Sequence, residues 1–258
     1  MSPNVLNSRA YASYISTRND IVAGTGEKAL HEFADRYKVY LKGWMPQEKS
    51  ARILDAACGH GNALYAFHSW GYSNLEGVDL SEEQVYEARK RFPQVVCGDV
   101  ITFLSSHSEQ YELITAFDLL EHLPPDEASA FLDGAYQALR EGGRLVLQTP
   151  NAAGARPGNL MWGDITHCHF YAPCALRQLL NLTGFTDINF RETCPLAHGI
   201  KSFCRVWLWK CLRIIMSTCD IIETGKRQTV YTRNMLVSAR KYADGNLLTG
   251  AQGGTRKK

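Results

Sequence analysis

Residues 51–61, ARILDAACGHG, decide the fold. The apolar run in the first part of this stretch predicts a buried strand over 51–58. Gly59 and Gly61 follow Asp55, and two glycines one residue apart let the backbone turn tightly into a helix and approach a ligand closely. A strand that turns at once into a helix is the repeating unit of a parallel α/β sheet, and ligands of such sheets bind outside the carboxyl ends of the strands.

The same alternation of short apolar runs and helical stretches continues along the chain. Further strands are predicted at 74–80, 95–99, 111–118, 144–151, 186–192 and 229–241. Helices are predicted at 62–71, 82–92, 124–143, 173–185 and 201–223. Right-handed crossovers place the helices between parallel strands on both faces of the sheet, so we expect an α/β domain.

Composition limits the classes of protein and their partners. The chain has 258 residues, and 28 Lys and Arg against 26 Asp and Glu give a net charge of +2, which argues against a nucleic-acid-binding protein. The first twenty residues have no apolar core of a signal peptide, and no uncharged apolar run reaches the length of a membrane span. We therefore expect a cytoplasmic protein. Its eight cysteines include no CxxC pair, so we expect no structural zinc site.

The expected domain organisation has three parts. Residues 1–45 are expected to form an N-terminal helical cap, and 46–241 the main domain. The main domain carries a Gly-, Pro- and His-rich insertion at 152–170 on the side where a substrate would enter. Residues 242–258 are polar and glycine-rich and are expected to be a disordered tail.

Acidic residues end three successive strands. Asp79 ends the second strand, 24 residues after Asp55, and can accept hydrogen bonds from two ribose hydroxyls. Asp99 ends the third and can accept one from the amino group of adenine. The third glycine of the dinucleotide fingerprint would fall at position 64, which is Leu64, and no P-loop lysine follows the glycines. The pattern indicates a cleft for a nucleoside without phosphates.

The segments ILDAACGHGNAL, GVDLSEEQV, CGDV, AFDLLEHL and LREGGRLVLQTPN resemble, in order, the successive motifs of class I S-adenosylmethionine-dependent methyltransferases. The resemblance covers residues 50–150. It implies a Rossmann-like, seven-stranded sheet that is mostly parallel, with helices on both faces and an antiparallel last strand at 229–241. It also implies that S-adenosyl-L-methionine is the cofactor.

The resemblance also assigns ten residues to the cofactor. The positions that match the family's motifs are Asp55, Ala57, Gly59 and Gly61 at the methionine end, Asp79 and Leu80 at the ribose, Asp99 and Val100 at the adenine, and Phe117 and Asp118 on the pocket wall. Ala57 departs from the family, in which glycine is commoner at this position. We expect alanine to be tolerated there if its φ is negative.

A narrower resemblance concerns the acceptor. GDITHCHFYAPCALRQLLNLTGF, residues 163–185, resembles a segment of bacterial methyltransferases associated with surface-polysaccharide and O-antigen gene clusters, and more distantly ubiquinone-pathway O-methyltransferases. The resemblance implies a hydroxyl on a sugar or surface-glycan precursor as the acceptor. The alternative is a small-molecule acceptor such as a phenol, a quinone or a secondary metabolite.

Histidine is the expected catalytic residue type. Methyl transfer to an alcohol benefits from a base that removes the hydroxyl proton, and imidazole suits that task near neutral pH. The candidates are His122, His167 and His169, with His167 favoured and Asp164 expected to orient it. The run from Asp118 to His122 also resembles a magnesium-binding set of some ubiquinone-pathway methyltransferases, but an ordinary hydrogen-bond network fits it as well. We expect no metal.

The predicted helix at 201–223 is strongly amphipathic. One interpretation is a cap helix that packs on the core or on a second copy in a homodimer. The other is an interfacial helix, which would make the enzyme a peripheral membrane protein.

Three other functional classes stay open at this point. A methyltransferase acting on RNA, DNA or protein is disfavoured by the near-neutral charge of the chain. It is also disfavoured by the sequence AFDLLEH at 116–122, because enzymes that methylate amino groups of nucleic acids typically have Asn/Asp-Pro-Pro-Tyr at this position. A dinucleotide oxidoreductase is disfavoured by Leu64. An inactive cofactor-binding protein is the third class, and only a turnover assay distinguishes it from an enzyme.

Overall fold

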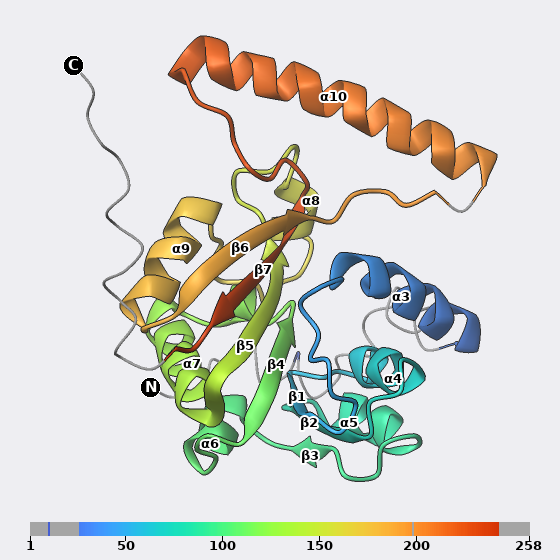
Figure 1. Ribbon diagram of the computed structural model, residues 1–258, viewed down its shortest axis with the longest axis vertical. Helices are drawn as coiled ribbons and strands as arrows, with labels where there is room; N and C mark the ends of the chain where they lie inside the picture. Colours follow the sequence, from blue (N-terminus) through green and yellow to red (C-terminus); the bar gives the residue numbers. More distant parts are fainter. Residues whose placement is uncertain (1–9, 11–25, 198, 243–258) are drawn as a thin grey trace.

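The computed structural model describes residue 10, residues 26–197 and residues 199–242. Within these residues, one seven-stranded sheet has the order β3-β2-β1-β4-β5-β7-β6 (Figure 1). Its strands are β1 Arg52–Ala56, β2 Asn74–Asp79, β3 Val96–Cys97, β4 Tyr111–Phe117, β5 Leu139–Pro150, β6 Thr186–Glu192 and β7 Asn234–Arg240. The pairs among β1 to β5 are parallel, whereas β7 runs antiparallel to both of its neighbours. The predicted fold class and the antiparallel last strand are confirmed.

Helices cover both faces of the sheet (Figure 1). On one side lie α3 Glu27–Tyr40, α4 Asn62–Ser69 and α5 Glu82–Arg89. On the other lie α6 Val100–Ser105, α7 Pro125–Ala138 and α9 Pro173–Leu182. The remaining elements are a 3₁₀ turn, η1 Leu120–His122, the short α8 Gly158–Met161 and the long α10 Ile200–Thr224.

The two layers follow from the two-residue period of a strand. In β1, Ile53 packs among the side chains of α3 and α4, and its neighbour Leu54 packs among those of α6 and α7. Both are fully buried. A central parallel strand needs apolar residues on both faces, which is why two successive residues of β1, Ile53 and Leu54, are apolar.

The boundaries of several predicted elements are corrected. The helix predicted to end at Gly142-Gly143 ends at Ala138, and β5 begins at Leu139 and continues through both glycines. Gly142 has φ +75°, and its NH donates to the carbonyl of Lys241, so the pair forms an irregular strand start. The strand predicted at 95–99 has only two residues, and the one predicted at 229–241 begins at Asn234.

The sequence missed α6 altogether. Asp99 is its N-cap, and one of its carboxylate oxygens accepts a hydrogen bond from the NH of Thr102 at 2.8 Å. The cap therefore forms at the residue that was assigned to adenine. Of the expected N-terminal cap, α3 is described, whereas residues 243–258 of the expected tail lie outside the described residues. Within the described part of the chain, no helix combines the length and apolarity needed to cross a membrane.

Candidate cofactor and acceptor site

A cavity of about 290 Å³ opens at the carboxyl ends of β1, β2 and β4. Its walls include nine of the ten residues that the sequence assigned to the cofactor, namely Asp55, Ala57, Gly59, Asp79, Leu80, Asp99, Val100, Phe117 and Asp118. The tenth, Gly61, is not on the wall but is the N-cap of α4, where its φ of +89° favours glycine. The structure thus brings the predicted residues together around one cavity.

Asp79 holds the glycine turn as well as facing the cavity. One carboxylate oxygen accepts the NH of Gly59 at 2.8 Å, and the other accepts the NH of Ser81 at 2.9 Å. Burial raises the pKa of Asp79, and these two hydrogen bonds oppose that rise. A carboxylate fixed in this way stays oriented toward the cavity, where it can accept hydrogen bonds from a pair of hydroxyls.

Asp55 lies at the bottom of the cavity. It is almost fully buried, and it accepts a hydrogen bond from the hydroxyl of Thr115 on β4 at 2.7 Å. Burial raises the pKa of this carboxyl to about 7, although the hydrogen bond from Thr115 lowers it and Asp79 raises it further. A buried carboxyl of this kind is a strong partner for a cationic ligand group, because the ligand replaces the solvation lost on folding.

The condition set for Ala57 is not met. Its φ is +61°, in the left-handed region, whereas tolerance was expected to depend on a negative value. Asp118, at the end of β4, also has a positive φ of +56°. Two residues other than glycine with strained backbones on the wall of one cavity are unusual, and such strain concentrates at functional sites.

A hydrogen-bond chain that the sequence analysis missed links α3 to the cavity. The hydroxyl of Tyr37 donates to Gln148 at 2.6 Å, and the amide of Gln148 donates to both carboxylate oxygens of Asp118 at 3.0 Å. Phe33, one turn before Tyr37, lines the cavity. The amphipathic pattern of α3 was the available signal, but it did not show which part of the sheet the helix covers.

His122 has one ring nitrogen fixed by a chain of hydrogen bonds. The hydroxyl of Thr166 donates to Asp164 at 2.6 Å, so its oxygen accepts from Nδ1 of His122 at 2.9 Å. Thr166 and Asp164 are both buried. With Nδ1 as the donor, Nε2 carries the lone pair, which is the form that a general base requires. Of the three candidate histidines, His122 is the one on the cavity wall.

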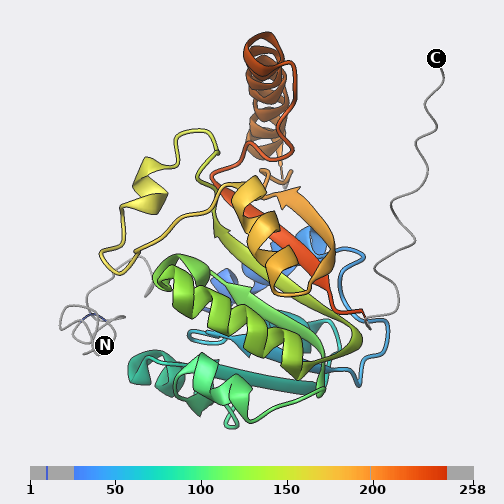
Figure 2. The same ribbon diagram turned by 90° about the vertical axis from the view of Figure 1, so that its left-hand side faces the viewer.

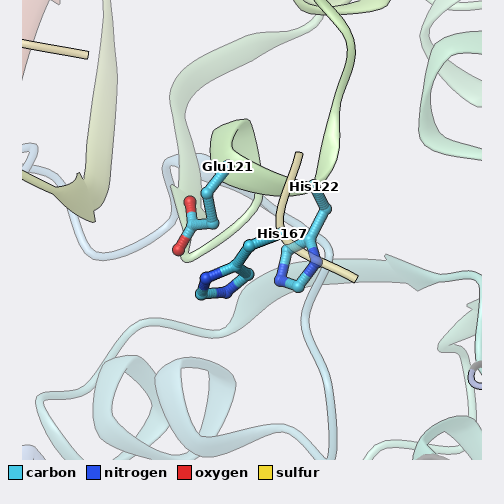
Figure 3. Close-up of side chains that lie close together, drawn as sticks. All are labelled: Glu121, His122 and His167. Atoms are coloured by element: carbon cyan, nitrogen blue, oxygen red, sulfur yellow. The ribbon is translucent and has the colours of Figure 1, made fainter. Parts of the chain in front are cut away.

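His167 lies against His122, with ring centroids 4.7 Å apart (Figure 3). Its Nδ1 donates to the carbonyl of Met161 at 2.9 Å, so its Nε2 is also an acceptor. Asp164 was expected to orient His167, and its backbone carbonyl accepts from the NH of His167 at 3.3 Å. Its carboxylate also acts on His122 through Thr166. His169 packs on Tyr171, with ring centroids 4.6 Å apart.

Glu121 completes this cluster (Figure 3). Its carboxylate is buried and accepts from the hydroxyl of Thr149 at 3.0 Å. Burial first, and the charge of Asp118 second, raise its pKa well above the usual value. Glu121, His122 and His167 offer three ligand atoms within 4.8 Å of one another, a spacing that suits a metal ion.

Residues 27–189 match the model of a methyltransferase domain family. The ubiquinone biosynthesis O-methyltransferase of Psychrobacter arcticus is 28% identical over 108 residues, which cover 39% of this chain and 41% of that protein. The 27-O-demethylrifamycin SV methyltransferase of Amycolatopsis mediterranei is 27% identical over 135 residues, 50% of this chain and 47% of that protein. The match thus spans less than half the length of either relative.

The fold has close counterparts among solved structures. A SAM-dependent methyltransferase from Archaeoglobus fulgidus superposes with a TM-score of 0.61 at 21% sequence identity, covering 81% of this chain and 94% of that one. The family match covers well over half of the chain, and the predicted cofactor residues surround one cavity. The chain belongs to the methyltransferase domain family, and its cofactor is that of the S-adenosylmethionine-dependent members.

Proposed function

We propose that this protein transfers the methyl group of S-adenosylmethionine to a hydroxyl group, with His122 as the general base. The observation that carries the proposal is the chain from Asp164 through Thr166 to His122, because it leaves Nε2 of a cavity-wall histidine as an acceptor. The relative from Psychrobacter arcticus is named an O-methyltransferase, and the one from Amycolatopsis mediterranei is named a methyltransferase of 27-O-demethylrifamycin SV. Both names support oxygen as the acceptor atom.

The reaction needs little beyond alignment and one proton transfer. The acceptor oxygen attacks the sulfonium methyl in line, the carbon–sulfur bond breaks, and S-adenosylhomocysteine leaves with the bonding electron pair. The hydroxyl proton passes to Nε2 of His122. The imidazolium that forms donates from Nδ1 to Thr166, whose own proton is held by the carboxylate of Asp164. His167 lies beside the reacting proton and can help to position the acceptor.

The finer proposal for the acceptor is the sugar or surface-glycan precursor expected from the sequence. Trp162 and Phe170 lie edge to face, with ring centroids 5.0 Å apart, and Phe170 also contacts the ring of His167. Trp162 is 72% exposed. An exposed aromatic face beside His167, the neighbour of the proposed base His122, suits the stacking of a sugar or of an aromatic ring. A phenolic or other small-molecule acceptor is therefore the alternative outcome of the test below.

The test is transfer of labelled methyl from S-adenosylmethionine into fractions of a bacterial cell extract. Label in polysaccharide or glycolipid supports the sugar acceptor, and label in small molecules moves the acceptor to the alternative. Label only in protein or RNA contradicts the proposal. With the acceptor fraction in hand, His122→Ala should lower kcat by about 100-fold or more, while S-adenosylhomocysteine binding persists.

Thr166 tests the orientation of His122 without removing the base. Thr166→Val keeps the shape of the side chain but removes the hydroxyl that accepts from Nδ1. We expect kcat to fall by about tenfold or more with KM little changed, and Thr166→Ser to restore it. A loss of stability without a change in kcat would assign Thr166 a purely structural role.

A second mechanism has its own supporting observation, the cluster of Glu121, His122 and His167. Two imidazoles and a carboxylate could hold a divalent ion that lowers the pKa of an acceptor hydroxyl. We expect the enzyme to keep its activity after treatment with EDTA and gel filtration, because His122 alone supplies the base. Activity that is lost with EDTA and restored by one divalent ion would replace this mechanism with the metal-assisted one.

A further inference from the structure

The helix α10 stands away from the rest of the molecule. It spans Ile200–Thr224, 25 residues or about 37 Å, and each of its residues is at least partly exposed. In Figure 1 it runs across the top of the molecule, and in Figure 2, where it is seen nearly end-on, it projects beyond the sheet. Such a helix has a side that faces the body and a side that faces away from it.

The inner side holds α10 to the body. Arg213 pairs with Glu192 at the end of β6, and Asp220 accepts from the hydroxyl of Tyr231 at 2.6 Å. Trp209 and Met216 line a cavity of about 800 Å³ beneath the helix. These four helix residues lie on one side at 100° per residue, so the opposite side is left to face outward.

The outward side is apolar along its whole length. Its large side chains, each more than half exposed, are Phe203, Trp207, Leu208, Ile214, Ile215 and Ile222. They recur at the three- and four-residue spacing of one helix face. Monomeric proteins rarely expose a continuous apolar surface of this extent unless it binds something.

Cations border this outward face. Lys201, Arg205 and Lys210 lie along its edges, with Lys210 placed 4.7 Å above the ring of Trp207. Lys226 and Arg227 follow the C-terminal end. Over residues 200–227 the sequence has six cations and two acids. Arg213 and Asp220 belong to the inner side, which leaves five cations and one acid. An apolar face with aromatic residues and basic edges fits an anionic lipid surface, in which the apolar side chains enter the acyl boundary and the cations meet the headgroups.

Self-association fits this charge pattern less well. Two copies of α10 packed face to face would bring basic edges together in either direction, because cations lie both at its start and just beyond its end. An anionic bilayer, in contrast, neutralises all of them. We propose that the outward face of α10 docks on an anionic lipid bilayer, with the helix axis lying in the plane of the membrane surface.

The experiment is sedimentation of the full-length protein with vesicles of phosphatidylcholine alone or with one third phosphatidylglycerol. We expect at least tenfold more protein bound to the anionic vesicles, and weaker binding at high salt. The double variant W207E/I214E should lose this binding. The control is Leu182→Glu, which also replaces an exposed apolar side chain by an acidic one. Leu182 is 76% exposed and lies on α9, so this variant should still bind the anionic vesicles.

Each other outcome contradicts the proposal. Wild-type protein that stays in the supernatant with anionic vesicles overturns it. A wild-type dimer that becomes monomeric in W207E/I214E, without vesicle binding, would assign the face to a second copy instead. The substituted side chains are solvent-exposed, so the variants should fold and bind S-adenosylhomocysteine like the wild type. That binding is measured without vesicles, so failure of docking and failure of cofactor binding are separate results.

Discussion

At the scale of single residues, the strained backbone at Ala57 gives a direct test of the cavity's geometry. An alanine with φ +61° carries a cost of about 1 kcal/mol that glycine does not. Glycine also loses more conformational freedom on folding, so Ala57→Gly should raise the free energy of unfolding by at most about 1 kcal/mol, and the melting temperature by at most about 2–4 °C. Thermal unfolding measured by circular dichroism checks this.

Ala56→Gly is the matched control. Ala56 is buried in β1, with an ordinary strand backbone, so the same change should destabilise the protein. A destabilised Ala57→Gly would contradict the left-handed backbone at this position.

The raised pKa of Asp55 predicts a pH dependence of cofactor binding. The resemblance places the methionine end of the cofactor here, so its ammonium group needs the ionised carboxylate. With a pKa of about 7, ionisation is nearly complete at pH 8 and about one-tenth complete at pH 6. Affinity for S-adenosylhomocysteine should therefore fall about tenfold between pH 8 and pH 6, measured by titration calorimetry.

The sign of this effect follows from the direction of the shift. Because burial raises the pKa of Asp55, its carboxylate favours cofactor binding above pH 7, and its protonated form opposes binding below pH 7. The unliganded protein behaves in the opposite way. Its free energy of unfolding falls as the pH rises from about 4 to 7, because the folded state holds the proton of Asp55 over this range and the unfolded state does not. Asp55→Asn should abolish the pH dependence. Thr115→Val removes a hydrogen bond that lowers the pKa, so it should move the transition to higher pH. Equal affinity at both pH values in the wild type would contradict the assignment.

At the scale of elements, the close approach of β2 to the glycine turn makes Gly77 indispensable. A Cβ at this position would lie 2.9 Å from both Sγ of Cys58 and Cδ1 of Leu64. Gly77→Ala should therefore cost about 1–3 kcal/mol and push the turn out of place, lowering cofactor affinity as well. Chemical denaturation and calorimetry measure the two effects.

Gly98 provides the control for this substitution. It follows β3 on the neighbouring strand, and a Cβ there would meet nothing within 4 Å. Gly98→Ala should leave the free energy of unfolding within about 0.5 kcal/mol of the wild type. If both variants were equally stable, the packing of β2 against the turn would be wrong.

The same scale shows what sequence patterns can predict. Strands β1, β2 and β4 are mainly apolar toward their carboxyl ends and are followed closely by acidic residues, so these ends, and the cavity residues on them, were predictable. The boundary between α7 and β5 was not, because Gly142-Gly143 is typical of a helix end and here lies inside β5, which begins at Leu139. Short α6 lacks a pattern of its own and depends on the cap at Asp99.

Contacts between segments far apart in the sequence were not predictable. Thr166 lies 44 residues from His122, and Tyr37 lies 111 residues from Gln148. Neither pair shares a strand or helix whose periodicity would place both partners. The candidate histidines were found from their chemistry. The hydrogen bond that orients His122 was not predictable, because it depends on how the 152–170 insertion, which carries Thr166, packs against η1.

At the scale of the whole molecule, a sheet with a cofactor cavity at one edge carries an acceptor-side insertion and an outward-facing amphipathic helix (Figure 2). The central claim is that the cavity binds S-adenosylmethionine. The proposed general base and acceptor can take part in methyl transfer only if the methyl donor is bound next to them.

The most direct measurement is calorimetric titration of the wild-type protein with S-adenosylhomocysteine and, separately, with NAD⁺. We predict one S-adenosylhomocysteine bound per chain, lost in a folded Asp79→Ala variant, and no binding of NAD⁺. Binding of NAD⁺ in place of S-adenosylhomocysteine, or an Asp79→Ala variant that binds as tightly as the wild type, would contradict the account.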